Sequence, residues 1–126
     1  MNIPNKLKYT KDHEWIAIDG DIATVGITDF AQRELGDIVY VEIETIGEVL
    51  KADEVFGTVE AVKTVSDLFL PVEGEILEFN EDLETSPENV NNDPYEKGWM
   101  IKMKVSNPSD LDNLLTSDDY SKLIGE

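Results

Sequence analysis

Short segments in which apolar and polar residues alternate make up much of the chain. Residues 15–18 and 22–27 flank Asp19-Gly20-Asp21, a combination that predicts two strands joined by a tight turn. Residues 37–44 and 99–105 also alternate, which predicts two further half-buried strands. In the first of these strands, one face is expected to carry Val39, Val41 and Ile43, and the other face Ile38, Tyr40 and Glu42. In the second strand, one face is expected to carry Trp99, Ile101, Met103 and Val105, and the other face Met100, Lys102 and Lys104.

Two apolar segments, residues 55–62 and 65–70, meet at Lys63. Both have the length and the β-branched content of a strand, so the pair predicts a hairpin with Lys63 at its tip. Pro71 then interrupts the pattern, which resumes at residues 75–79. Because proline has no N–H group for a strand ladder, Pro71 suits the end of a strand.

Helical signals occur near residues 28–35 and in the tail. Thr28 and Asp29 offer an N-cap to the first helix, and Gly36 is a suitable end for it. The polar residues 80–93 predict a short helical turn and a loop. Two tail helices are expected within about residues 109–124. Ser109 can cap the first, which carries Leu111, Leu114 and Leu115. Thr116 or Ser117 can cap the second, which carries Tyr120, Leu123 and Ile124.

The overall pattern of many short strands separated by turn signals predicts a mainly β fold. We expect a sandwich or flattened barrel with the C-terminal helical segment packed on it. The length of 126 residues suits a single domain, residues 1–126.

The charge balance bears on the kind of partner. The chain has 10 Lys and Arg residues against 28 Asp and Glu residues, a formal net charge of −18. This argues against nucleic-acid binding, because neutralising phosphates requires Lys and Arg. Two interpretations remain open: the acidic surface steers the protein toward basic patches on other proteins, or it only keeps the protein in solution.

Most catalytic chemistry is poorly supported. There is no cysteine, and His13 is the only histidine, so disulfides, thiolate nucleophiles and histidine-rich metal clusters are excluded. No phosphate-binding or zinc-protease motif is present. We therefore expect a protein that is not an enzyme. No apolar run approaches the ~20 residues of a membrane-spanning helix, and the N-terminus resembles no signal or transit peptide, so we expect a cytoplasmic protein, or a mitochondrial-matrix protein if the chain is a matured eukaryotic one.

Lys63 has two interpretations on local pattern alone. It is the only Lys or Arg between Asp53 and Tyr95, and apolar residues precede and follow it. A hairpin tip would present its amine to a modifying enzyme, and an amide bond there would remove its charge. Alternatively, Lys63 is an ordinary turn residue whose stem covers the edge of the core while its ammonium stays in water. The pattern by itself favours the second interpretation.

The chain resembles the H proteins of the glycine cleavage system over nearly its whole length. The stretch around Lys63, F-G-T-V-E-A-V-K-T-V-S-D-L at 56–68, carries the resemblance most directly. The other matching stretches are Y-T-K-D-H-E-W at 9–15, A-T-V-G-I-T-D-F-A-Q at 23–32, L-G-D-I-V at 35–39, P-V-E-G at 71–74 and V-N-N-D-P-Y-E-K-G-W-M at 90–100.

The resemblance implies a carrier with lipoic acid in amide linkage to Lys63. It also implies a biotinyl/lipoyl-like fold of two antiparallel sheets with the modified lysine in a hairpin turn. The implied partners are a pyridoxal-phosphate glycine decarboxylase, an aminomethyltransferase that uses tetrahydrofolate, a dihydrolipoyl dehydrogenase and the lipoate-attaching enzymes. Such a carrier shuttles the aminomethyl group of glycine between these enzymes, and we expect it to be a monomer.

The resemblance also points to residues around the arm. H proteins are expected to fold the loaded arm into a cleft, where Glu14 and Asp67 are candidates to face its ammonium group. Glu60, three residues before Lys63, matches a position that lipoate-attaching enzymes recognise. His13 either shapes this cleft or is a structural histidine. Phe30 stands where relatives often have His or Tyr, so a polar contact to the arm is missing there.

Two other functions fit the same resemblance. Some H-like proteins serve as a relay, on which octanoyl or lipoyl groups are placed before transfer to other enzymes. The second alternative is an interaction module that kept the fold but carries no modification. The intact mass of the protein separates these functions, because lipoyl, octanoyl and absent adducts differ in mass.

Overall fold

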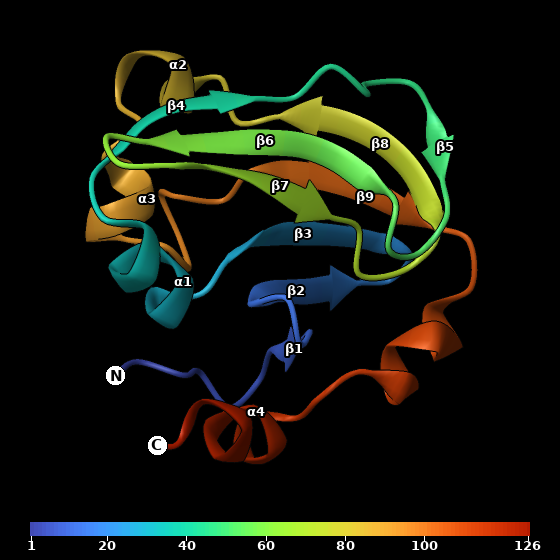
Figure 1. Ribbon diagram of the computed structural model, residues 1–126. Coiled ribbons are helices and arrows are strands. Elements are labelled where there is room, and N and C mark those ends of the chain that lie inside the picture. Colours follow the sequence, from blue (N-terminus) through green and yellow to red (C-terminus); the bar gives the residue numbers. More distant parts are fainter.

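The computed structural model describes all residues, 1–126, and contains two antiparallel β-sheets (Figure 1). The predicted mainly β architecture of two antiparallel sheets is therefore confirmed. The six-stranded sheet consists, in spatial order, of β1 (Lys8–Tyr9), β2 (Glu14–Asp19), β3 (Ile22–Ile27), β9 (Ile101–Val105), β8 (Gly74–Phe79) and β5 (Val49–Leu50). The three-stranded sheet consists of β4 (Ile38–Glu42), β6 (Val55–Ala61) and β7 (Val65–Phe69).

Both predicted hairpins are present. β2 and β3 pair from Glu14 opposite Ile27 to Asp19 opposite Ile22, and Gly20 occupies the turn with a φ of 69°. This left-handed backbone conformation costs glycine little, which explains the Asp-Gly-Asp signal. β6 and β7 form the second hairpin, with Glu60 opposite Val65 at its closed end.

The predicted faces of β4 are wrong at its first two residues. Ile38 and Val41 are buried, whereas Val39 and Tyr40 are exposed. The pairing of β4 with β6 shifts register between Ile38 and Tyr40, as in a β-bulge. An extra residue in one strand moves the side chains before it to the opposite face, so simple alternation across the whole strand fails here.

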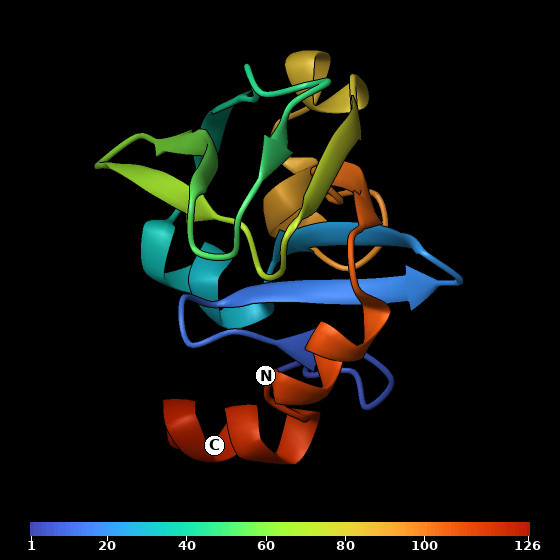
Figure 2. The same ribbon diagram turned by 90° about the vertical axis from the view of Figure 1, so that its right-hand side faces the viewer.

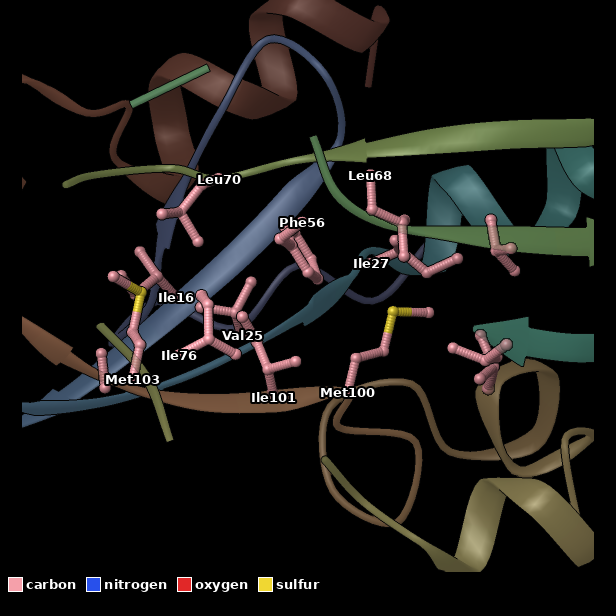
Figure 3. Close-up of a cluster of buried hydrophobic side chains, with 14 of the residues drawn as sticks. Ile16, Val25, Ile27, Phe56, Leu68, Leu70, Ile76, Met100, Ile101 and Met103 are labelled. Atoms are coloured by element: carbon pink, nitrogen blue, oxygen red, sulfur yellow. The ribbon is translucent and has the colours of Figure 1, made fainter. Parts of the chain in front are cut away.

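The main core fills the space between the two sheets, as Figure 3 shows for its central side chains. Phe56 and Leu68 come from the three-stranded sheet and face Val25 and Ile101 of the six-stranded sheet. Met100 belongs to this core and is fully buried, although alternation placed it on the polar face. β9 begins only at Ile101, so Met100 lies in the incoming loop, outside the pleat of the strand.

Helix α1 (Asp29–Leu35) forms as predicted. The Thr28 side chain accepts a hydrogen bond from the Ala31 N–H group, and Gly36 ends the helix with a φ of 83°. The polar segment after β8 contains two short helices in place of the single turn that was expected. These are α2 (Asp82–Thr85) and α3 (Asn89–Asn92).

The tail contains one 3₁₀ helix and one α-helix. The first helix, η1 (Pro108–Asn113), is capped by Asn107, and the predicted start at Ser109 is wrong. Of the three leucines expected on it, Leu111 is buried and Leu115 lies beyond it, bonded to Tyr9 by two backbone hydrogen bonds of 2.9 Å. Proline at the first position and the Asn107 side chain together explain the earlier start.

The last helix, α4 (Ser117–Ile124), is capped by Thr116 and ends at Gly125, both as predicted. It lies next to β1 (Figure 2), where Tyr9, Trp15 and Tyr120 form a second, smaller core. The rings of Tyr9 and Tyr120 stack, with centroids 4.8 Å apart and planes inclined by 9°. No helix in the structure is long and apolar enough to cross a membrane.

Candidate functional site

Lys63 occupies the middle of the three-residue turn between β6 and β7. The Ala61 N–H group donates to the Thr64 carbonyl across this turn at 2.8 Å, which closes it tightly. Lys63 is exposed, and its ammonium takes part in no ion pair. Figure 2 shows the hairpin projecting from the molecule above α1. The predicted hairpin tip is therefore present, with a free amine on it.

The turn is attached to the segment that follows α1. The Val62 N–H group donates to the Asp37 carbonyl at 3.1 Å. The Lys63 Cε atom lies beside Gly36, only 3.6 Å from the position that a Cβ atom would take there. The far end of the Lys63 stem therefore lies beside the C-terminal end of α1.

A cleft of about 140 Å³ opens beside this end of α1. Its walls come from α1, from β6 and β7, from the end of β3, and from the start of β2 with the residues that lead into it. It combines an apolar surface with four carboxylates, and its lining residues are Asp12, His13, Glu14, Ile27, Ala31, Glu34, Leu35, Val59, Ser66, Asp67 and Leu68. A larger hollow of about 260 Å³ contains no residue of α1 or of the Lys63 hairpin, so it is less suited to receive an arm from Lys63.

Glu14 is the most unusual group in the cleft. Its side chain is buried, with 2% exposure, and accepts hydrogen bonds from the Thr10 hydroxyl at 2.9 Å and the Phe69 N–H group at 3.0 Å. Burial nevertheless dominates and raises the pKa of Glu14 to about 8. At neutral pH this carboxyl therefore holds a proton.

Asp67 lines the same cleft, so the structure brings together the two acids that the resemblance paired. The two differ in surroundings, because Asp67 is exposed and lies on the edge strand β7. Strand alternation places Ser66 on the inner face with buried Val59, and Asp67 on the outer face. Asp67 therefore stands at the rim of the cleft, and Glu14 at its base.

Glu60 lies apart from this cleft. It is exposed on the outer face of the three-stranded sheet, with Tyr40 opposite it on β4 and Val65 opposite it on β7. Tyr40 is 48% exposed and Val65 is 61% exposed. Glu60 thus belongs to a surface beside the Lys63 turn that a protein partner can reach, and not to the wall of the cleft.

His13 lines the cleft and is also packed, which combines the two interpretations of this residue. Its backbone has a φ of 69°, and its ring lies 4.8 Å from the Phe30 ring. Its Nδ1 atom is 2.9 Å from the Tyr120 hydroxyl, which is in turn 2.8 Å from Thr28 Oγ1. Burial lowers the pKa of His13, which favours a neutral ring at this position.

Two kinds of site residue were missed from the sequence. Ala31, Glu34 and Leu35 all line the cleft, and their spacing of three and four residues puts them on one face of α1, a signal that was available. Tyr120 had no such signal, because 107 residues separate it from His13. Only the packing of α4 against β1 brings its hydroxyl to the cleft wall.

Replacing Tyr120 with Phe is expected to loosen this wall. The change removes the hydroxyl between His13 and Thr28, so a destabilisation of about 1–2 kcal/mol is expected from the loss of buried hydrogen bonds. Urea unfolding measures the stability, and amide hydrogen exchange at His13 measures the local effect. Tyr40→Phe is the control, because Tyr40 is exposed and its hydroxyl makes no hydrogen bond. An equal loss of stability in both variants would contradict the role assigned to Tyr120.

Comparison with known proteins agrees with this geometry. The family model for the glycine cleavage H-protein matches residues 7–126. Glycine cleavage system H proteins of Bacteroides fragilis and Bacteroides thetaiotaomicron are each 60% identical to the chain over 124 residues, which is 98% of the chain and 98% of each relative.

A solved structure is similar across the same length. The crystal structure of a glycine cleavage system H protein from Mycobacterium marinum superposes with a TM-score of 0.86 at 38% sequence identity, covering 98% of this chain and 100% of that one. The match therefore extends over the sheets, the Lys63 hairpin and the tail together. The chain belongs to the glycine cleavage H-protein family, whose members are the non-catalytic lipoyl carriers of the glycine cleavage system.

Proposed function

We propose that this chain bears lipoic acid in amide linkage to Lys63 Nζ and carries the aminomethyl group of glycine on it. The observation that carries the proposal is an exposed, unpaired amine at the tip of a tight turn, with its stem beside a cleft-lining helix. An attaching enzyme needs an amine that protrudes from the fold. Lys63 meets that requirement without any change in the strands that hold it.

The residues of the cleft suit such an arm. Ile27, Leu35 and Leu68 give an apolar surface to a hydrocarbon chain, and Glu14, Glu34 and Asp67 give carboxylates to an amine at its end. When bound, the lipoyl group supplies a disulfide that accepts the one-carbon unit and two electrons. The protein itself has no cysteine, so none of its own side chains competes in disulfide exchange.

Glu14 is proposed to respond to a cation in the cleft. Its proton is retained because burial disfavours the carboxylate. An ammonium group placed nearby would favour the charged form, so Glu14 would release its proton as the cation enters. Asp67 at the rim would also attract the ammonium group, and its carboxylate would lose less of its hydration than that of Glu14. The apolar walls around Glu14 would keep water away from the bound group.

Glu60 is proposed as part of the surface that lipoate-attaching enzymes recognise. It lies three residues before Lys63, on the outer face of β6, and its neighbours Tyr40 and Val65 are exposed. An enzyme that grips the hairpin from this side would approach the Lys63 amine without touching the cleft. Recognition would then use the outer face of the hairpin, and protection would use the cleft, with only Asp67 of the outer face at its rim.

The proposed partners are the other components of the system: glycine decarboxylase, aminomethyltransferase and dihydrolipoyl dehydrogenase. The net charge of −18 supports encounters with basic patches on these enzymes. Such encounters weaken as salt screens the charges. A monomer that acts in the cytoplasm is part of the proposal, and the bacterial origin of the relatives agrees with it.

Peptide mass mapping tests the attachment site. The full chain is incubated with a lipoate ligase, ATP and lipoate, and the modified peptide is then identified. One lipoyl group on the peptide that contains Lys63 supports the proposal, whereas a lipoyl group elsewhere, or none, overturns it. The protein isolated from its native cells gives the second test: an octanoyl group in place of a lipoyl group would point to the relay function.

A further inference from the structure

One side chain of α3, that of Asn91, makes three hydrogen bonds: to α1, to Gly36 directly after it, and to the first residue of β4. Asn91 Oδ1 accepts from the Ile38 N–H group at 2.9 Å. Its Nδ2 group donates to the Gly36 carbonyl at 2.9 Å and to the Gln32 side-chain oxygen at 3.0 Å. Both amide hydrogens of the Asn91 side chain are therefore in use, one on Gly36 and the other on Gln32 of α1.

The same segment holds the Lys63 turn on its other side. Gly36 and Ile38 flank Asp37, whose carbonyl accepts the hydrogen bond from the Val62 N–H group at 3.1 Å. Ile38 also pairs with Ala61 in the β4–β6 ladder. One chain of hydrogen bonds thus runs from α3, through residues 36–38, to the residue directly before Lys63.

The bond to Gln32 connects this chain to the cleft. Gln32 also donates to Asp29 at 2.7 Å, so its side chain spans α1 from its first residue toward α3. The adjoining face of α1 carries Ala31, Glu34 and Leu35, which line the cleft. Asn91 therefore contacts the helix that forms one cleft wall and the segment that fixes the base of the Lys63 arm.

We propose that Asn91 is a positioning residue that fixes the base of the Lys63 arm relative to the cleft. The inference rests on the proposed function of Lys63 but assigns a role to a residue that touches neither the arm nor the cleft. If the attachment point of the arm is fixed, the end of the arm reaches the same depth in the cleft each time it enters. Because the cleft measures only about 140 Å³, a displaced anchor would leave the end of the arm outside its carboxylates.

Amide hydrogen exchange in the unmodified full-length chain tests the physical part of the inference. In Asn91→Ala, exchange at Val62 is expected to accelerate about tenfold, because residues 36–38 lose two hydrogen bonds and Gln32 of α1 loses a third. Asn80→Ala is the matched control. Asn80 is buried, whereas Asn91 is half-buried, and it donates to the Lys97 and Trp99 carbonyls, each at 2.9 Å, far along the chain from the turn. Equal acceleration at Val62 in both variants, or none in Asn91→Ala, overturns the inference.

The lipoylated variants test the functional part. Attachment of the lipoyl group to Asn91→Ala is expected at an unchanged rate, because the turn remains exposed. The glycine-derived one-carbon unit is expected to be released to water about tenfold faster than from the wild type or from Asn80→Ala. Equal release overturns the inference even if exchange at Val62 accelerates. A wild-type chain that takes up no lipoyl group at Lys63 would instead refute the proposed function, while the exchange result would stand.

Discussion

Lys63→Arg is expected to abolish lipoylation and, with it, all support of glycine cleavage by this chain. Arginine keeps the positive charge and the long stem, but its guanidinium stays protonated in proteins and is no nucleophile for amide formation. Because Lys63 is exposed and unpaired, the free energy of unfolding should change by less than about 0.5 kcal/mol. The measurements are the intact mass after ligase treatment and glycine decarboxylation with the partner enzymes.

Lys51→Arg is the matched control for this experiment. Lys51 is also exposed and lies in a turn, between β5 and β6, but no cleft-lining residue adjoins it. The control variant should gain the same mass as the wild type and support the full rate. Any lipoyl mass on Lys63→Arg, or glycine cleavage by it, would mean that the arm is attached to a different residue.

The second large effect concerns Glu14 and the pH dependence of stability. The pKa of Glu14 rises from 4.5 to about 8 on folding, so between these pH values the folded protein binds a proton that the unfolded chain has lost. The stability that this proton provides is fully present below about pH 4.5, declines across the interval, and is lost once the pH passes about 8. The slope from this group approaches about 1.4 kcal/mol per pH unit.

Glu14→Gln should remove this slope, because glutamine keeps the size and the neutral charge of the protonated acid. Urea unfolding of both proteins from pH 5 to 9 measures it, and the difference between the two curves isolates Glu14. This subtraction matters because the lowered pKa of His13 acts in the opposite direction below about pH 6.5. Glu34→Gln, at an exposed position of the same cleft, is the control. Parallel curves for the wild type and Glu14→Gln would contradict the raised pKa of Glu14 in the folded protein.

The local signals were sufficient for the hairpins and the helix caps. Gly20 and Gly36 adopt the left-handed conformations that their turns required, and Thr28 and Thr116 cap their helices as predicted. These features depend on a few neighbouring residues, so a short window of sequence contains their cause. The hairpin tip at Lys63 belongs to the same class, because two apolar strands and a short turn define it.

The errors arose where neighbouring chain segments overrode the pattern. The bulge at Ile38 and Tyr40 appears only when β4 is paired with β6, and Met100 is buried because the loop before β9 enters the core. β6 lies well beyond β4 in the sequence, and the core that receives Met100 is built from both sheets, so neither effect can be read from the adjacent residues. Asn107 displaced Ser109 as a cap for a more local reason, since Pro108 already suits the first position of a helix.

By itself, the sequence determined most of the strands, the hairpin that presents Lys63, the acidic charge and, by resemblance, the family. Only the tertiary structure decided what surrounds the arm. It buried Glu14 against the Phe69 N–H group, left Asp67 at the rim and joined α3 to the Lys63 turn through Asn91. The physical reason is that burial and hydrogen bonding depend on which distant segments pack together, and the pKa of a carboxyl follows its surroundings and not its place in the sequence.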